Sequence, residues 1–192
     1  MKKMKPLLTV IAIIAIAGFG FLYLKKDKTN SPTSQDASRQ RDVTAIKNFS
    51  GNQNAAVEFV EASKSSNGEV VPVNVYYSGA DQYEVDANGK IVEFRSRDLP
   101  IGNENEKVLD YTARYNQQEM EVIARQLIAK DAPEADLEKL TLTQNSKESG
   151  KTKNYFFRWE DRTKQTSEGY PYIQVSYSQG GTLIGYINVL GL

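Results

Sequence analysis

The densest combination of charged and aromatic side chains in the chain is the run Arg158-Trp159-Glu160-Asp161-Arg162. As a binding site, Trp159 would stack against a sugar ring or a peptide group, while Arg158 and Arg162 would hold a carboxylate through paired hydrogen bonds. As part of a core, Trp159 would be buried, and Arg158 and Glu160 would form cross-strand ion pairs worth less than about 1 kcal/mol. The sequence favours the structural interpretation, and the contact site is its alternative.

Two further groups bear on contact and on catalysis. Arg95 and Arg97 are two residues apart, so on a strand they share a face, where they meet an acidic partner or form a charged, solvated sheet edge. Glu160 and Asp161 are adjacent, so a strand points them to opposite faces, whereas a glycosidase needs two carboxylates that flank one bond. The residues predicted to contact a partner are therefore Arg95, Arg97, Arg158, Trp159 and Arg162.

The composition removes several classes of reaction. The chain of 192 residues has no His and no Cys, which excludes imidazole bases, thiol nucleophiles, disulfides and the usual zinc sites. An enzyme that relies on Ser, Lys, Asp or Glu alone needs a recognisable nucleophile and base, and we find no such motif. We therefore predict a non-enzymatic protein with no catalytic, cofactor-binding or metal-binding residues.

An apolar segment from 6 to 24, PLLTVIAIIAIAGFGFLYL, has lysines on both sides. As a helix it would span roughly 28 Å, close to the hydrocarbon core of a bilayer at about 30 Å. It is either an uncleaved signal anchor or a signal peptide cut after Ala17, and the apolar stretch beyond Ala17 favours the anchor. We predict a cytoplasmic tail at 1–5, a single pass through the cell membrane, and a C-terminal domain outside the cytoplasm.

The balanced net charge conceals an asymmetry. The chain has 24 Lys and Arg against 24 Asp and Glu, and residues 1–28 contain six of the Lys and one of the Asp. The remainder is therefore about five charges negative, which argues against nucleic acid as a partner. Residues 25–42 are polar and without apolar periodicity, which predicts a disordered tether between the membrane segment and the folded part.

The next segment, 43–100, is predicted to form a β-rich half. Residues 54–63 are ambiguous between a short helix and a strand, and 69–77 is rich in strand-forming residues, with Pro72 favouring an edge. The clearest hairpin is 83–94, because Asn-Gly at its centre supplies the positive φ of a tight turn. A calcium loop at this turn is the weaker interpretation, since the rest of the ligand spacing is missing.

The last segment, 101–192, begins with helical signals and ends in strands. A short helix is expected at 106–114. Asn116 and Glu119 form a capping pattern before a helix whose apolar face is Met120, Ile123, Ala124, Leu127 and Ile128. Strands are expected at 137–143, 153–161, 171–178 and 182–190. In the second of these, alternation places Tyr155, Phe157 and Trp159 on one face and Phe156, Arg158 and Glu160 on the other.

The order of these elements resembles the PepSY-type domain, and in particular the PepSY-related repeats of exported or membrane-anchored proteins of Gram-positive bacteria. The residues that carry the resemblance are the stretch from Tyr83 to Ile91, YEVDANGKI, and a looser copy from Tyr172 to Leu183 that has Ser176 in place of the usual Asp. The resemblance implies an α+β fold: a transmembrane helix, then an amphipathic helix packed on antiparallel β-sheet. Whether 43–100 is a second, degenerate unit stays open.

The resemblance also implies a function without catalysis. Domains of this family are associated with inhibiting or escorting peptidases and cell-wall lytic enzymes at the cell envelope. We therefore predict a membrane-anchored envelope protein that binds or regulates such a protein partner. The alternative is a cell-wall or carbohydrate-binding module that uses Trp159 and exposed Tyr residues. The sequence does not indicate an oligomeric state.

Overall fold

The structure is a computed structural model that describes residues 34–65, 71–96, 112–149 and 152–191. The chain divides into two compact units, residues 1–36 and residues 37–192. Of the first unit only the start of helix α2 is described, and every other element given below belongs to the second unit.

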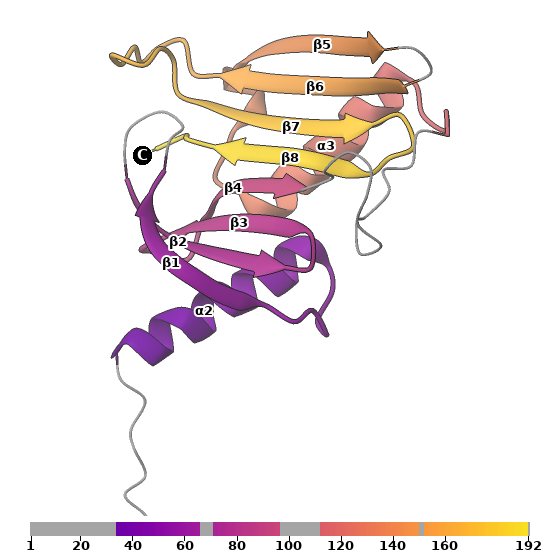
Figure 1. Ribbon diagram of the computed structural model, residues 1–192. Coiled ribbons are helices and arrows are strands. Elements are labelled where there is room, and N and C mark those ends of the chain that lie inside the picture. Colours follow the sequence, from indigo (N-terminus) through magenta and orange to yellow (C-terminus); the bar gives the residue numbers. More distant parts are fainter. Residues whose placement is uncertain (1–33, 66–70, 97–111, 150–151, 192) are drawn as a thin grey trace, which may run out of the picture. The chain divides into compact units, whose positions relative to one another are not determined.

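The described residues form two α-helices, one short 3-10 helix and eight strands (Figure 1). The helices are α2 (Ser34–Ser50), α3 (Gln117–Asp131) and the 3-10 helix η1 (Leu137–Lys139). The strands are β1 (Glu58–Lys64), β2 (Pro72–Ser78), β3 (Asp81–Asp86), β4 (Ile91–Ser96), β5 (Thr141–Ser149), β6 (Thr152–Glu160), β7 (Tyr172–Ser178) and β8 (Leu183–Asn188).

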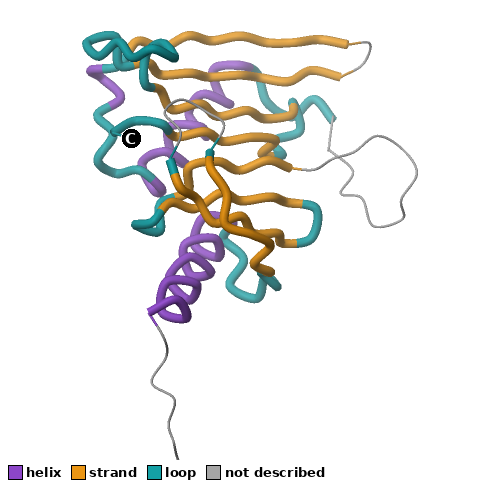
Figure 2. The backbone as a smooth tube through the Cα atoms, turned by 60° about the vertical axis from the view of Figure 1, so that its left-hand side comes forward, coloured by secondary structure: helices purple, strands orange, loops and turns teal. Residues whose placement is uncertain are grey.

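All eight strands belong to one antiparallel sheet, in the order β1-β2-β3-β4-β8-β7-β6-β5. Each half of the chain contributes a helix followed by four strands that pair in sequence, and the fourth strands, β4 and β8, join the halves. This arrangement leaves β1 and β5 at the two edges. In Figures 1 and 2, β5 is the uppermost strand of the sheet, with no described strand beyond it.

Helix α3 begins at a capping box, as the sequence predicted. The Asn116 side chain accepts hydrogen bonds from the backbone N–H groups of Gln118 and Glu119, and the Glu119 carboxylate accepts one from the Asn116 N–H at 2.8 Å. These bonds satisfy N–H groups that a helix start leaves without partners. The buried side chains of the helix are Met120, Ala124 and Ile128, three members of the predicted apolar face.

The β3–β4 hairpin also confirms its prediction. Asp86 Oδ1 accepts hydrogen bonds from the N–H groups of Asn88 and Lys90 at 2.8 and 2.9 Å, so its carboxylate closes the turn. Gly89 has a φ of +86°, and a Cβ there would lie 2.6 Å from Nε of Arg41 on α2. The positive φ therefore requires glycine at this position, and the Arg41 side chain would have to shift to admit a Cβ.

One face of the sheet, which we call the helix face, carries a row of large side chains in direct cross-strand register. Seven neighbouring strands contribute one residue each, and all but one of these residues are aromatic. Directly opposed residues of neighbouring strands point to the same side, so the row is continuous. From β1 to β6 it consists of Phe59, Tyr76, Tyr83, Phe94, Tyr186, Val175 and Phe157.

Both helices pack on this row. Phe49, in the last turn of α2, has its ring centroid 6.1 Å from that of Tyr83, 5.6 Å from Phe94 and 5.1 Å from Tyr186. These three residues belong to β3, β4 and β8, so Phe49 lies over the junction of the two halves. Helix α3 lies against β6 and β7, and its buried residues join the same hydrophobic cluster.

A buried carboxylate attaches α2 to the sheet. Asp42 is fully buried, and its Oδ2 accepts hydrogen bonds from the Tyr76 hydroxyl at 2.8 Å and from Asn74 Nδ2 at 2.9 Å. Its Oδ1 accepts one from the Arg41 guanidinium at 3.0 Å. Both oxygens are therefore satisfied, which is the condition under which a buried charge is tolerated. Burial and the neighbouring Asp42 raise the pKa of Tyr76, so its hydroxyl keeps the proton that it donates.

The expected fold class is wrong. We expected an α+β chain with a transmembrane helix followed by an amphipathic helix on an antiparallel sheet, in one or two PepSY-like units. The structure is instead mainly one eight-stranded antiparallel sheet with two helices. The predicted membrane segment at 6–24 lies outside the described residues. No helix within the described ranges is long and apolar enough to span a bilayer.

Several element predictions need correction. Residues 34–42, expected in the tether, are helical. Of the two alternatives for 54–63, the strand is the one observed, at 58–64. Pro72 does not mark an edge: it is the first residue of β2, a strand paired on both sides, and a first position tolerates proline because no ladder bond precedes it. The strand expected at 137–143 is β5 at Thr141–Ser149. The helix expected at 106–114 lies mostly outside the described residues, and 112–116 is not helical.

We predict that Asp42→Ala lowers the free energy of unfolding by about 3 kcal/mol, because it leaves the buried Tyr76 hydroxyl and the half-buried Asn74 amide without their acceptor. Urea unfolding followed by circular dichroism measures this. Tyr76→Phe is the matched variant: it removes one donor and leaves the carboxylate two partners, so about 1 to 2 kcal/mol is expected. A loss below about 0.5 kcal/mol for Asp42→Ala would show that the carboxylate does not hold α2.

Candidate functional site

Trp159 belongs to the core. Its side chain is fully buried on the helix face, where its ring is stacked with Phe157 at a centroid distance of 6.2 Å. The Arg125 guanidinium of α3 lies 5.5 Å from the centroid of the Trp159 ring. The structural interpretation of Trp159 is therefore the one that holds, and the indole is not available to stack against a partner or a sugar.

The predicted arginine contacts are not brought together. Arg95 and Arg158 lie on the side of the sheet opposite the helices, which we call the open face. They stand on β4 and β6, two strands that lie about 14 Å apart with β8 and β7 between them. Arg162 lies after β6 and pairs with Glu160 at 3.2 Å. Arg97 lies outside the described residues.

Each of the two open-face arginines is held by its neighbours. Arg158 Nε donates to Gln174 Oε1 at 2.9 Å, and its guanidinium lies 4.0 Å from the centroid of the Tyr172 ring. Arg95 forms an ion pair with Glu93. Directly opposite Glu93 stands Glu84, whose pKa is raised first by burial and then by the charge of Glu93. Arg95 therefore compensates the negative charge of these carboxylates, and both arginines are engaged with side chains of this chain rather than free for a partner.

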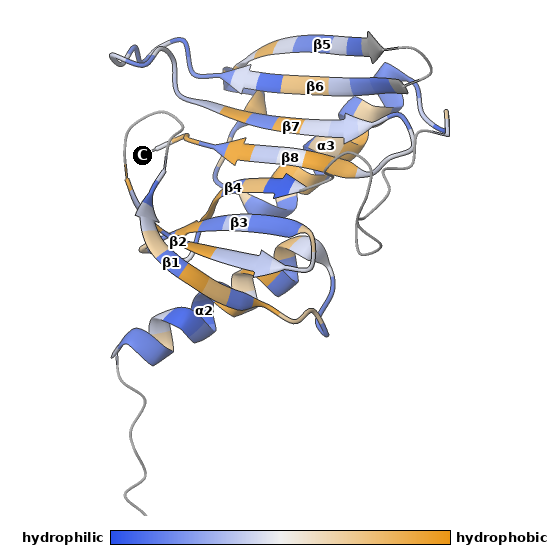
Figure 3. Cartoon of the chain, in the orientation of Figure 1, coloured by the Kyte–Doolittle hydropathy of each residue, from blue (hydrophilic) through white to orange (hydrophobic). Residues whose placement is uncertain are grey.

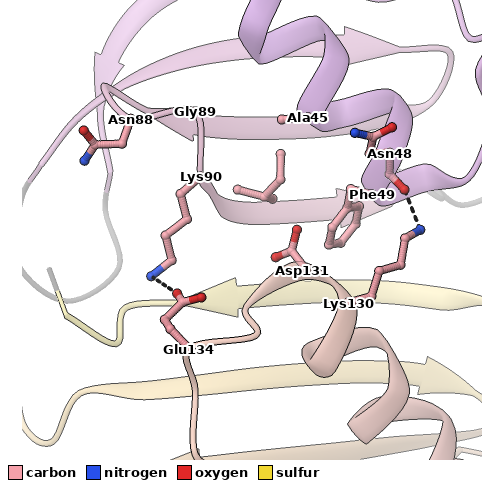
Figure 4. A pocket seen from close by; sticks show the side chains of 10 residues that line it. Ala45, Asn48, Phe49, Asn88, Gly89, Lys90, Lys130, Asp131 and Glu134 are labelled. Atoms are coloured by element: carbon pink, nitrogen blue, oxygen red, sulfur yellow. Dashed lines mark hydrogen bonds and ion pairs between the residues drawn. The ribbon is translucent and has the colours of Figure 1, made fainter.

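A cavity of about 350 Å³ lies where the ends of both helices meet the β3–β4 turn (Figure 4). Its apolar wall is made by Ala45 and Phe49 of α2 and by Ile91 of β4. Its charged groups come from the turn and from the end of α3. Figure 4 shows them surrounding the opening: Lys90, Lys130, Asp131 and Glu134.

The two ammonium groups at the cavity already have acceptors. Lys130 Nζ donates to the backbone carbonyl of Asn48, in the last turn of α2. Lys90 Nζ donates to the carbonyl of Leu190 at 2.9 Å and lies 3.8 Å from Glu134 Oε1. The cations are therefore engaged with groups of this chain.

Asp131 is the group at the cavity that is least satisfied. Its Oδ2 is buried and has no hydrogen-bond partner among the described residues. Burial is the main reason why its pKa is raised, and a hydrogen bond from the Tyr186 hydroxyl offsets part of that rise. It is also the last residue of α3, where the negative end of the helix dipole disfavours a carboxylate.

The edges of the sheet differ in how well they are protected. Strand β1 has seven residues, carries Glu58, Glu61 and Lys64, and is interrupted by a register shift between Phe59 and Glu61. Short length, charge and bulges are the usual protection of an edge against pairing with another chain. Strand β5 has nine residues and pairs with β6 over its whole length without a register shift. Figure 3 shows it mainly in hydrophilic colours.

The free edge of β5 can be assigned from the neighbouring strands. The Asp161 N–H donates to the Pro171 carbonyl, and the Gln179 N–H donates to the Lys153 carbonyl. The backbone N–H and C=O groups of the odd-numbered residues of β6 therefore point toward β7. The backbone groups of the even-numbered residues of β6 therefore point toward β5, where they pair with odd-numbered residues. The backbone groups that point to the open edge of the sheet belong to Leu142, Gln144 and Ser146.

Helix α3 holds β5 in place. Gln144 Oε1 accepts a hydrogen bond from Gln117 Nε2 at 2.9 Å, and Gln144 Nε2 donates to the Glu121 carboxylate. Glu121 is paired in turn with Arg125 at 2.8 Å. The edge strand is therefore ordered before any other chain meets it, which lowers the entropic cost of pairing.

The described part of the chain contains no group of three or more His, Cys, Asp or Glu side chains placed to hold a metal ion. Comparison of the chain with protein-family models, curated proteins and solved structures finds no match. The resemblance to PepSY-type domains therefore stays a prediction. The chemistry available at the described sites is hydrogen bonding along a strand edge and ionic contact at the cavity.

Sequence reasoning missed both of these features. The cavity unites residues of α2, the β3–β4 turn and the end of α3, which are far apart in the sequence, so no local pattern marks it. One signal was present: Asp131 is a carboxylate in the last turn of a predicted helix, against the preference for cations there. For β5, the alternation of apolar residues that marks a strand is absent from TLTQNSKES.

We predict that Asp131→Asn stabilises the protein near neutral pH by about 0.5 to 1 kcal/mol, because it removes a buried charge from a helix C-terminus. A raised pKa means that this carboxyl favours the fold most below its ordinary pKa of about 3.9 and loses that effect as pH rises through the raised value. Urea unfolding at about pH 4 and about pH 8 measures the difference. An equal effect at both pH values would contradict the role of charge.

We predict that Trp159→Ala destabilises the fold by about 3 to 5 kcal/mol, the usual cost of removing a fully buried aromatic side chain. Arg158→Ala, the neighbour on the open face, is the control and should cost less than about 1 kcal/mol. Thermal unfolding of both variants provides the measurement. A Trp159→Ala protein as stable as the Arg158→Ala protein would show that the indole is not part of the core.

Proposed function

We propose that this chain is a non-enzymatic protein of the bacterial cell envelope whose folded part binds a protein partner by strand addition at β5. An extended segment of the partner would pair with the free edge and continue the sheet. Such strand addition takes its affinity from main-chain hydrogen bonds and its specificity from alternate side chains. A peptidase or a cell-wall lytic enzyme is the class of partner that the resemblance to PepSY-type domains implies.

The observation that carries the proposal is the contrast between the two edges. Strand β1 is short, charged and bulged, whereas β5 is long, regular and ordered by α3. From Thr141 to Lys147 the side chains of β5 are polar apart from Leu142, and Lys147 adds a charge, so the edge does not favour indiscriminate aggregation. These properties suit reversible pairing with a chosen segment.

The envelope location is part of the proposal and is supported by the sequence. The apolar segment 6–24 with lysines on both sides is typical of an anchor. The acidic character of the remaining chain suits a partner with basic surface groups. The alternative of a carbohydrate-binding module loses its main support, because Trp159 is buried.

The test uses the full chain with an affinity tag, expressed in the organism that encodes it and cross-linked before extraction. Ser146→Pro removes an N–H that points to the open edge, and should lower the yield of a specific cross-linked partner at least about tenfold. Ser146→Ala is the matched control, because it removes the hydroxyl and keeps the N–H. Its yield should equal that of the unmodified chain.

Unfolding measurements complete the test. Since edge positions whose N–H faces away from the sheet tolerate proline, Ser146→Pro should remain folded, whereas Asn145→Pro should be strongly destabilised by loss of a bond to β6. An equal yield of the cross-linked partner with Ser146→Pro and with Ser146→Ala would contradict the strand-addition proposal. So would unfolding of Ser146→Pro together with a stable Asn145→Pro protein, because the free edge would then be assigned to the wrong residues.

A further inference from the structure

Two buried carboxylates face each other where the halves of the sheet join. Glu84 of β3 and Glu93 of β4 are direct cross-strand partners on the open face, and Glu93 is paired on its other side with Ile187 of β8. We infer that Glu84 and Glu93 share one proton, and that this proton strengthens the junction between the halves and makes it sensitive to pH. The inference is independent of strand addition at β5.

The first argument is the position of the two side chains. Directly opposed residues of antiparallel strands have Cβ atoms about 4.5 to 5.5 Å apart, and like charges in this position are destabilising. Glu84 is 8% exposed and Glu93 is 2% exposed, so solvent screens their repulsion much less than it would at the surface. When two carboxylates share a site, one of them holds its proton to a higher pH.

The second argument is the balance of charge around the pair. Arg95 of β4 forms an ion pair with Glu93. The other side chains that face the pair from its own and the neighbouring strands are apolar, acidic, amide or phenolic: Glu58 and Glu61 of β1, Val75 and Tyr77 of β2, Gln82 and Asp86 of β3, and Ile187 of β8. Within the described part of these strands one arginine therefore stands against two carboxylates, and the pair keeps an excess negative charge until it binds a proton.

The third argument is an oxygen without a partner. Glu84 Oε2 is buried and accepts no hydrogen bond from the described residues, so an ionised Glu84 loses hydration there without replacement. Burial is the main reason why the pKa of Glu84 is raised, and the charge of Glu93 adds to the rise. The charge of Arg95 and a hydrogen bond from Ser65 offset part of this rise in pKa.

The raised pKa fixes the direction of the pH effect. A carboxyl group whose pKa is higher in the folded than in the unfolded chain favours the fold most below its ordinary value, about 4.3 for glutamate. It loses that contribution as pH rises through the folded value. Because β4 and β8 pair only from Glu93 to Arg95, we expect the loss of the proton to weaken the sheet at this junction.

The test is a titration of the full chain in a neutral detergent, from about pH 3 to about pH 9, in which carbon-13 shifts report each glutamate carboxyl group. We expect the midpoint of Glu84 to lie above the ordinary value of about 4.3. Glu93→Gln should lower this midpoint, because it removes the neighbouring negative charge, and Arg95→Gln should raise it. Glu168→Gln, at an exposed position between β6 and β7, is the control and should leave it unchanged.

Hydrogen exchange tests the effect on the junction. The amide protection factors of the β4–β8 pairing should be at least about threefold lower at about pH 8 than at about pH 5 in the unmodified chain. Glu84→Gln should abolish this difference, because its side chain does not titrate. A Glu84 midpoint at or below the ordinary value, or one that Glu93→Gln leaves unchanged, would overturn the shared proton. Protection that depends equally on pH with and without Glu84→Gln would overturn its role at the junction.

Discussion

The packing of Phe49 on three strands is the contact on which the rest of the structure depends. The two halves of the sheet are joined where β4 pairs with β8, over three residue pairs only. Phe49 lies over this junction and contacts Tyr83, Phe94 and Tyr186 with its ring. Since aromatic contacts add stability beyond the area that they bury, one side chain of α2 compensates for a short stretch of backbone pairing. The same contact brings the end of α2 toward the end of α3, and the cavity forms between them.

Two carboxylates, the fully buried Asp42 and the half-buried Asp131, show how differently the fold treats charge. Asp42 has partners on both oxygens, from Tyr76, Asn74 and Arg41, and attaches α2 to the sheet. Asp131 has a partnerless oxygen and a position at the wrong end of a helix dipole. A satisfied buried carboxylate is accounted for by stability alone. An unsatisfied carboxylate oxygen that is shielded from solvent, such as Asp131 Oδ2, costs stability.

The sequence predicted elements whose signals are local. The Asn116 and Glu119 capping box, the Asn-Gly turn and the alternation of Tyr155, Phe157 and Trp159 each depend on neighbours within a few residues, and the structure confirms them. Helix α2 was missed because its first half is polar and its stability comes from Asp42 and Phe49 in tertiary contact. Strand β5 was expected four residues too early, at 137–143, for a similar reason, since pairing with β6 orders a sequence without alternation. The cavity depends on contacts between distant segments, which no local pattern encodes.

Helix α3 connects the free edge of β5 to the cavity. Its first turns hold β5 through Gln117 and Glu121, and its last residue, Asp131, lines the cavity. Fifteen residues of helix span about 22 Å, so one rigid element fixes the distance between the free edge and the cavity.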